Sequence, residues 1–212
     1  MGQRGYVTLY RPTGLDELSI MHDLGMRAFP PRLPQQSIFY PVTTLEYATA
    51  IARDWNVKSP SAAGYVTRFA LDETYAASFE RHVVGGREHE ELWVPAEQLS
   101  TFNSHIVGVI EIVAAFFGGN YTGAVPAHFM LKGLSAVEQL VGLSSLNDDF
   151  PMDFHLELRA NQKAIWLNYP FWTLHRFDAS ALPQTKKAAT LQAIREDWPK
   201  NAPPLPDLPS DD

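Results

Sequence analysis

Arg11, Tyr40 and Glu91 carry complementary chemistry, and each lies in or beside a segment with a β-strand pattern. Arg11 is a permanent planar cation that suits a bidentate contact with phosphate. Tyr40 offers an aromatic face for stacking and a hydroxyl at its tip. Glu91 can accept a hydrogen bond from a sugar hydroxyl and stabilise positive charge in an oxocarbenium-like transition state. Together these side chains would suit a nucleotide whose N-glycosidic bond is broken.

Glu91 ends the charged stretch 87–91, which runs directly into the apolar residues Leu92-Trp93-Val94. A carboxylate at the mouth of a strand can be held rigidly and face a cleft. Each residue also has a plain structural interpretation. Taken alone, the glutamates of this stretch would form a solvated turn, Arg11 would be a surface or salt-bridged cation, and Tyr40 would be a core residue. The occurrence of Arg11, Tyr40 and Glu91 in this order, each in or beside a β-type segment, favours a functional site.

The alternation of bulky and polar residues and the positions of proline predict the elements before Tyr40. Bulky and polar residues alternate over 6–11 and predict a strand, which is followed by a helix over 15–24. The segment 29–34, Phe-Pro-Pro-Arg-Leu-Pro, cannot be a regular element because its prolines prevent helix formation and remove strand donors. We therefore expect a stiff loop that either connects two elements or forms a wall of the site with Arg32 pointing inward.

The elements that position Tyr40 and Glu91 follow in order. A short strand over 37–42, interrupted by Pro41, precedes Thr43 and Thr44, which can cap a helix over 45–56. Later segments predict a strand at 65–71, a turn or short helix at 74–79, a strand from Leu92, a short helix from Pro95 and a strand at 106–117. This order predicts a mixed α+β fold of largely antiparallel character for residues 1–117.

A boundary is predicted at the glycine-rich segment 118–123. Beyond it we expect helices at 126–134 and 135–143, a hairpin of strands at 152–158 and 163–168, and a final helix at 184–198. Residues 118–201 would thus form an α/β extension, either separate or packed as part of the first domain. The acidic, proline-rich segment 202–212 is expected to be a flexible tail.

Composition excludes several classes of protein. The net charge of −7 argues against tight nucleic-acid binding, and the absence of cysteine excludes disulfides and thiolate chemistry. No apolar run is long enough for a membrane span and no signal peptide is visible, so we expect a cytoplasmic protein of bacterial type. The spacing of His82, Glu88 and His89 matches no established metal-ligand pattern, and we expect no metal.

Several motifs resemble the ADP-ribosyltransferase superfamily. They are Leu9-Tyr10-Arg11, the segment 38–43 with the helix that follows it, and the segment 91–95, Glu-Leu-Trp-Val-Pro. More closely, residues 6–117 resemble bacterial proteins labelled "ADP-ribosylation/crystallin J1", which have similar FPPRLP, FYPV, ELWVPAE and FN-x-x-I-x-G elements. The resemblance implies a split, largely antiparallel sheet with flanking helices and a cleft for NAD.

The resemblance also implies roles for individual residues. Arg11 would hold the phosphate or ribose side of NAD, with Arg32 nearby, Tyr40 would stack on nicotinamide, Glu91 would be the catalytic carboxylate, and Thr43 would support it. The Arg-Tyr-Glu set mixes two subclasses of the superfamily, and His89 stands where arginine-specific toxins have a second acidic residue. The resemblance therefore implies no particular acceptor.

We expect a toxin-like mono-ADP-ribosyltransferase or an NAD glycohydrolase, with NAD as substrate and a protein, a small molecule or water as acceptor. The alternative is an ADP-ribosyltransferase-like module without catalysis, which binds a nucleotide or a protein in a regulatory or immunity role.

Overall fold

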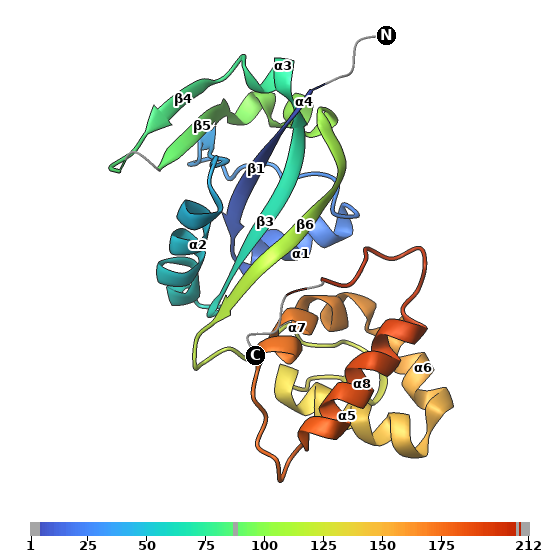
Figure 1. Cartoon of the computed structure of the whole chain (residues 1–212). Helices are drawn as coiled ribbons and strands as arrows, with labels where there is room; N and C mark the ends of the chain where they lie inside the picture. Colours follow the sequence, from blue (N-terminus) through green and yellow to red (C-terminus); the bar gives the residue numbers. More distant parts are fainter. Residues whose placement is uncertain (1–4, 87–88, 207, 209–212) are drawn as a thin grey trace. The chain divides into compact units, whose positions relative to one another are not determined.

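The structure is a computed structural model that describes residues 5–86, 89–206 and 208. The chain divides into two compact units, Met1–Gly119 and Asn120–Asp212. In Figure 1 the first unit runs from blue to green and the second from yellow to red. The first unit combines helices with antiparallel strands, so the expected α+β class is confirmed.

The first unit contains two three-stranded antiparallel sheets. One has the order β1-β3-β6 and the other the order β2-β5-β4. The strands are β1 (Tyr6–Thr13), β2 (Ile38–Phe39), β3 (Ala63–Asp72), β4 (Glu80–Val83), β5 (Glu90–Pro95) and β6 (Ile106–Phe117). The helices are α1 (Leu15–Asp23), α2 (Leu45–Asp54), α3 (Glu73–Ala76) and α4 (Leu99–Ser104), with short 3-10 turns at Asn56–Lys58 and Ala96–Gln98.

Local chemistry explains where the two longer helices begin. Helix α2 begins after Thr44, whose side chain accepts a hydrogen bond from the Tyr47 N–H, so the expected threonine cap is confirmed. Helix α1 carries Asp16 and Glu17 in its first turn, where carboxylates stabilise the helix dipole. The loop between α1 and β2 contains the proline-rich segment, which forms no helix or strand.

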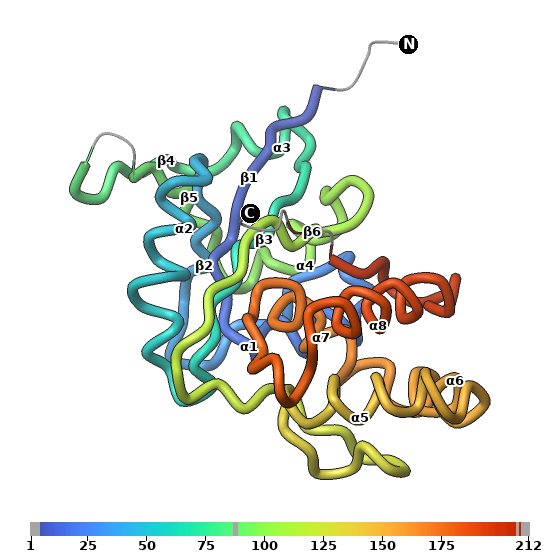
Figure 2. The backbone as a smooth tube through the Cα atoms, turned by 60° about the horizontal axis from the view of Figure 1, so that its bottom comes forward, coloured from blue at the N-terminus to red at the C-terminus, as the bar shows by residue number. Residues whose placement is uncertain are grey.

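Helices α1 and α2 pack on opposite faces of the sheet β1-β3-β6. Side chains alternate between faces along a strand, and Tyr10 on one face packs in a cluster with Val66 and with Ala48 and Ala52 of α2. Arg11, one residue further along, lies on the other face and contacts Glu17 of α1. Figure 2 shows the two helices on different sides of β1.

Val42 joins the two sheets through its main chain. Its N–H donates to Tyr10 O at 2.8 Å and its carbonyl accepts from Tyr10 N at 2.9 Å. On its other side Val42 forms a bridge with Glu91 of β5, and Thr43 N donates to Glu90 O at 3.1 Å. The chain around Val42 therefore brings the end of β1 and the start of β5 together.

The sheets separate one step beyond this bridge, and Pro12 explains why. In an antiparallel ladder the next hydrogen-bonded pair after Tyr10 and Val42 would be Pro12 and Tyr40. Pro12 has no N–H to donate to the Tyr40 carbonyl. That carbonyl accepts from Arg11 Nη1 instead, at 3.3 Å. The guanidinium therefore lies where β1 and β2 part.

The second sheet has one buried face. Phe39, Leu92 and Val94 are fully buried on it. The Phe39 ring lies 4.8 Å from that of Phe29 and 5.5 Å from that of Phe102, which anchors α4. This core leaves the other face of the sheet for polar and aromatic side chains.

The second unit is helical over its described residues. It contains α5 (Ala136–Asp149), α6 (Pro151–Ala160), α7 (Gln162–Leu174) and α8 (Gln184–Asp197), with a 3-10 turn at Phe129–Leu131. The Ser135 capping box at the start of α5 and the final helix are confirmed. The helix expected over 126–134 is reduced to the short turn, and the expected α/β extension is wrong because α6 and α7 replace the hairpin.

Two buried polar residues explain why a hairpin was predicted where the structure has α6 and α7. Glu157 takes part in the buried face of α6 with Phe154 and Leu158, and its carboxylate accepts from Met130 N and Asn161 Nδ2. Asn168 of α7 is fully buried, and its amide bonds to Tyr121, Gln139 and both main-chain groups of Ala124. A pattern that counts only apolar residues takes these positions as the exposed side of a strand.

The segment predicted to be a flexible tail packs against other residues of the second unit over its described part. Trp198 Nε1 donates to Pro203 O at 2.9 Å and Trp166 Nε1 donates to Pro204 O at 2.8 Å. Leu208 is 7% exposed. The remaining predicted tail residues, 207 and 209–212, lie outside the described part of the chain.

Substitution of Gly64 by Ala is expected to destabilise the first unit. A Cβ there would lie 2.1 Å from Ala52 O, in the main chain of α2, so the helix must move away from β3. We expect Gly64→Ala to lower the free energy of unfolding by about 1–3 kcal/mol in urea titrations. Gly119→Ala is the control, since a Cβ at Gly119 meets no atom within 4 Å. Equal stability of the two variants would contradict this packing.

Candidate functional site

Glu91 carries a carboxylate that two aromatic side chains orient. Tyr47 OH donates to Glu91 Oε1 at 2.8 Å and Trp93 Nε1 donates to Glu91 Oε2 at 3.3 Å. Tyr47 comes from the first turn of α2, and Trp93 lies two residues further along β5, on the same face of the strand. The carboxylate is partly exposed, and its orientation is set by neutral donors.

Aromatic rings lie around this carboxylate on the face of the sheet β2-β5-β4 opposite the buried Phe39. We call this set the aromatic face; it consists of Tyr40, Tyr47, His82, His89 and Trp93 around Glu91. The His82 and Trp93 rings stack at 3.9 Å, and the Tyr40 ring meets Trp93 edge-on at 5.7 Å. Trp93 is 37% exposed, so the face offers aromatic surface to a planar ligand.

Tyr47 is held in its neutral, donating form. Burial raises the pKa of Tyr47 to about 12, and the hydrogen bond to Glu91 and the negative charge of Glu91 act in the same direction. Its ring stacks on His89 at 4.2 Å, with 14° between the planes. At neutral pH this phenol therefore remains a hydrogen-bond donor to the carboxylate.

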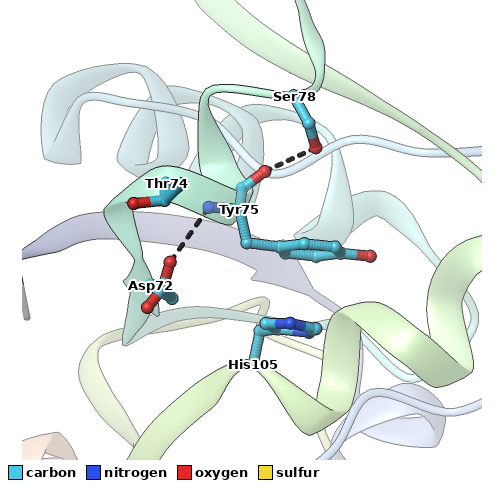
Figure 3. Close-up of a pocket in the computed structure, with 5 residues that line it drawn as sticks. All are labelled: Asp72, Thr74, Tyr75, Ser78 and His105. Atoms are coloured by element: carbon cyan, nitrogen blue, oxygen red, sulfur yellow. Dashed lines mark hydrogen bonds between the residues drawn. The ribbon is translucent and has the colours of Figure 1, made fainter.

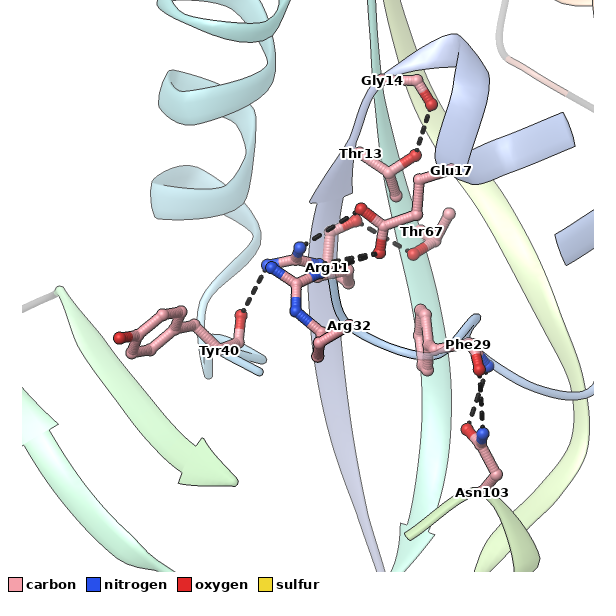
Figure 4. A network of polar contacts seen from close by, with 9 residues as sticks. All are labelled: Arg11, Thr13, Gly14, Glu17, Phe29, Arg32, Tyr40, Thr67 and Asn103. Carbon is pink, nitrogen blue, oxygen red and sulfur yellow. Dashed lines mark hydrogen bonds and ion pairs between the residues drawn. The ribbon is translucent and has the colours of Figure 1, made fainter. Parts of the chain in front are cut away.

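Arg11 and Arg32 form a second group around Glu17. Arg11 Nε and Nη2 donate to the two carboxylate oxygens of Glu17 at 3.3 and 3.2 Å, while Arg32 Nη1 lies 4.0 Å from Oε1. The Arg11 guanidinium also packs over the Phe39 ring at 5.0 Å. Figure 4 shows both arginines converging near Glu17. Two cations and one anion leave the group with a net positive charge.

Tyr40 connects the two groups through different parts of the residue. Its carbonyl accepts from Arg11, whereas its ring contacts Trp93, which in turn holds Glu91. Figure 4 shows the ring pointing away from the arginines while the carbonyl faces them. Tyr40 thus lies at the boundary between the cationic group and the aromatic face.

Thr43 contributes to the frame that holds the start of β5. Its N–H donates to Glu90 O at 3.1 Å, and its hydroxyl lies 3.5 Å from the same oxygen. These contacts fix the main chain immediately before Glu91. The described Thr43 contacts therefore involve the strand rather than the Glu91 carboxylate.

The structure brings the predicted residues together in two groups rather than in one. Register places Tyr40, Val42 and Glu91 on the α2 side of the joined sheets, whereas Arg11 projects on the α1 side. The contacts described for Arg11 and Arg32 involve Glu17, Phe39 and Tyr40. A ligand that touches both Arg11 and Glu91 must therefore extend past Tyr40, which contacts both groups.

Glu17, Tyr47 and Trp93, which bond directly to Arg11 or to Glu91, were not predicted as site residues. A signal for Glu17 was present, since an acidic residue in the first turn of a helix soon after a strand-ending arginine can fold back onto it. Trp93 shares the period-two face of Glu91 along the strand. No comparable sequence pattern indicated Tyr47, because its contact with Glu91 depends on the bridge at Val42.

Metal-binding groups of three or more His, Cys, Asp or Glu side chains are not found among the described residues. Arg87 and Glu88, which begin the charged stretch before Glu91, lie outside them. A separate hollow of about 560 Å³ is lined by Asp72, Thr74, Tyr75, Ser78 and His105. There the Tyr75 and His105 rings stack at 3.7 Å, and Asp72 caps α3 (Figure 3). None of these five residues contacts Glu91 or the arginines in the described structure.

Comparisons with protein families, with curated proteins and with solved structures find no match to this chain. No helix within the described residues has the length and apolar character needed to cross a membrane.

Tyr47 is expected to lose its proton only at high pH, and this deprotonation should lower the stability of the folded protein. Its pKa of about 12 in the folded protein lies above the ordinary value of 10.0, so the neutral phenol is the form that folding favours. The stabilisation that it contributes is complete below pH 10 and is lost as the pH rises through 12. Absorbance at about 295 nm would report the tyrosinate.

Comparison with Tyr47→Phe assigns the titration, because the chain has eight tyrosines and burial also raises the pKa of Tyr75. Tyr47→Phe should remove one late-titrating component. Glu91→Gln should lower the pKa of Tyr47, because the carboxylate contributes to raising it, although burial remains. An unchanged titration in both variants would contradict the contact between Tyr47 and Glu91.

Proposed function

We propose that this protein cleaves the bond between nicotinamide and ribose in NAD, as a mono-ADP-ribosyltransferase or an NAD glycohydrolase with an ADP-ribosyltransferase-like split sheet. One observation carries the proposal. Glu91 is oriented by Tyr47 and Trp93 within an aromatic face, and Tyr40 connects that face to a cationic pair. A carboxylate, aromatic surface and excess positive charge are what a dinucleotide with a cationic leaving base requires.

Glu91 is the group that would stabilise the reaction centre. The C1′–N bond breaks with its electron pair leaving on nicotinamide, whose positive charge is thereby neutralised. Positive charge develops on the ribose, and a fixed carboxylate stabilises it. Water or an acceptor nucleophile then bonds to C1′ and releases a proton. The two neutral donors to Glu91 fix its direction without cancelling its charge.

The remaining residues would bind and orient the two ends of the substrate. Tyr40 and Trp93 offer rings beside Glu91 for the planar nicotinamide. Arg11 and Arg32 offer guanidinium groups for the diphosphate, which is the most strongly anionic part of NAD. The substrate would therefore extend from Arg11 and Arg32 past Tyr40, with its ribose end at the aromatic face.

A specific observation favours a second candidate, a module that binds a nucleotide or a protein without catalysis. Arg11 is already engaged by Glu17 and by the Tyr40 carbonyl, and Arg11 and Glu91 project from opposite sides of the joined sheets. A protein that only binds ADP-ribose or a partner would not need both groups to act on one atom.

Substitution of Glu91 by Gln is the direct test of catalysis. Glu91→Gln keeps the side-chain shape but removes the charge, so nicotinamide release from NAD should fall by at least about 100-fold. Tyr47→Phe should reduce release by about tenfold, as expected for the loss of one hydrogen bond to a charged group. Release would be measured with and without cell lysate, since dependence on lysate indicates a transferase.

Glu90→Gln is the matched control, because Glu90 is the neighbouring acid and its carboxylate pairs with Arg81 at 3.0 Å. It should keep wild-type release. Equal loss in Glu90→Gln and Glu91→Gln would contradict a specific role for Glu91. Absence of release from folded wild-type protein, combined with binding of ADP-ribose, would instead support the module without catalysis.

A further inference from the structure

The group formed by Arg11, Arg32 and Glu17 is only partly neutralised, although it is largely buried. The side chains of Arg11, Arg32 and Glu17 are 12%, 11% and 19% exposed. Glu17 compensates one of the two positive charges. Buried charges are usually paired, because a cation removed from water without a partner is costly. One uncompensated charge in such a place is therefore unusual.

Arg32 is the guanidinium that is left with unused donors. Its nearest carboxylate contact, Nη1 to Glu17 Oε1, is 4.0 Å, which is too long for a hydrogen bond. Its Nε is buried and has no hydrogen-bond partner within the described residues. Burial lowers the pKa of Arg32, and the charge of Arg11 acts in the same direction. The stiff proline-rich loop holds Arg32 in this unfavourable place.

A single carboxylate does not satisfy the hydrogen-bond donors and the charge of Arg11 and Arg32, whereas a phosphate would. Glu17 has two oxygens and one charge, and Arg11 donates a hydrogen bond to each oxygen. A phosphate has more acceptor oxygens and a higher charge, so it could bond to both guanidinium groups at once. Glu17 lies in the first turn of α1, and its side chain is 19% exposed.

We propose that Glu17 is an internal occupant of an anion site made by Arg11 and Arg32, and that a phosphate-bearing ligand binds by replacing its carboxylate. The inference deepens the proposed function and rests on it in one respect, since the phosphate would belong to the dinucleotide. Glu17 then acts as a competitor built into the protein. It keeps the arginines in place without ligand and weakens phosphate binding in the wild-type protein.

The test is calorimetric titration of the whole protein with inorganic pyrophosphate. Glu17→Gln removes the competing charge and should tighten pyrophosphate binding by about tenfold or more. Asp16→Asn is the matched control, because Asp16 is exposed in the same helical turn and the substitution changes the net charge equally. Its affinity should stay close to that of the wild type. Equal tightening in both variants would overturn the proposal, since it would reflect net charge alone.

A second variant keeps the proposal testable where Glu17→Gln does not fold. Arg32→Met in the wild-type background leaves the Arg11–Glu17 pair intact and removes the unused donors. Pyrophosphate binding should then be lost, while the thermal unfolding temperature stays the same or rises because a buried charge that shares the single Glu17 carboxylate with Arg11 is gone. Binding that survives this substitution, or that is absent from the folded wild-type protein and from folded Glu17→Gln, would overturn the proposal.

Pyrophosphate has no nicotinamide and no ribose, so the outcome does not depend on NAD cleavage. Glu17-dependent binding in a protein that does not cleave NAD would retain the anion site and reject the catalytic function. If Arg32→Met leaves NAD cleavage unchanged and pyrophosphate binding does not depend on Glu17, the catalytic function is retained and the anion site is rejected.

Discussion

The main-chain pairing of Val42 is the constraint on which the rest of the first unit depends. Val42 bonds to Tyr10 on one side and bridges to Glu91 on the other, so two sheets share one short segment. Pro12 then prevents the next pair of the ladder from forming, because it has no N–H. The sheets must separate at this point. Arg11 fills the position by donating to the Tyr40 carbonyl that Pro12 leaves without a partner.

The two sides of the joined sheets have different chemistry. On the α1 side, two guanidinium groups share one carboxylate and retain positive charge. On the α2 side, Glu91 receives hydrogen bonds from two neutral aromatic donors and keeps its negative charge. Tyr40 belongs to both sides, through its carbonyl and through its ring. A substrate with anionic phosphates at one end and a cationic base at the other matches this separation of charge.

Much of the first unit could be predicted from the sequence, because its elements follow simple periods. Alternation over β1 and β3 and the threonine cap of α2 are local signals, and they predict the strand that carries Arg11 and the helix that follows Tyr40. The contacts between these elements are not local. The roles of Glu17 and Tyr47 follow from which helix covers which face of the sheet, and that depends on the Val42 bridge.

The second unit was predicted less well for a physical reason. Glu157 and Asn168 are buried and hydrogen-bonded to other parts of the unit, so polar residues stand where a helical pattern expects apolar ones. Pro151 at the first position of α6 was a local signal for a helix start that the alternating pattern outweighed. The capping box of α5 was predicted because both of its partners lie within one turn.

A crystal structure of the protein with ADP-ribose bound is the most direct test. We predict the diphosphate at Arg11 and Arg32, with the Glu17 carboxylate displaced, and the terminal ribose beside Glu91 and Tyr40. ADP-ribose bound elsewhere, or bound with Glu17 still paired to Arg11 and the ribose remote from Glu91, would contradict this prediction.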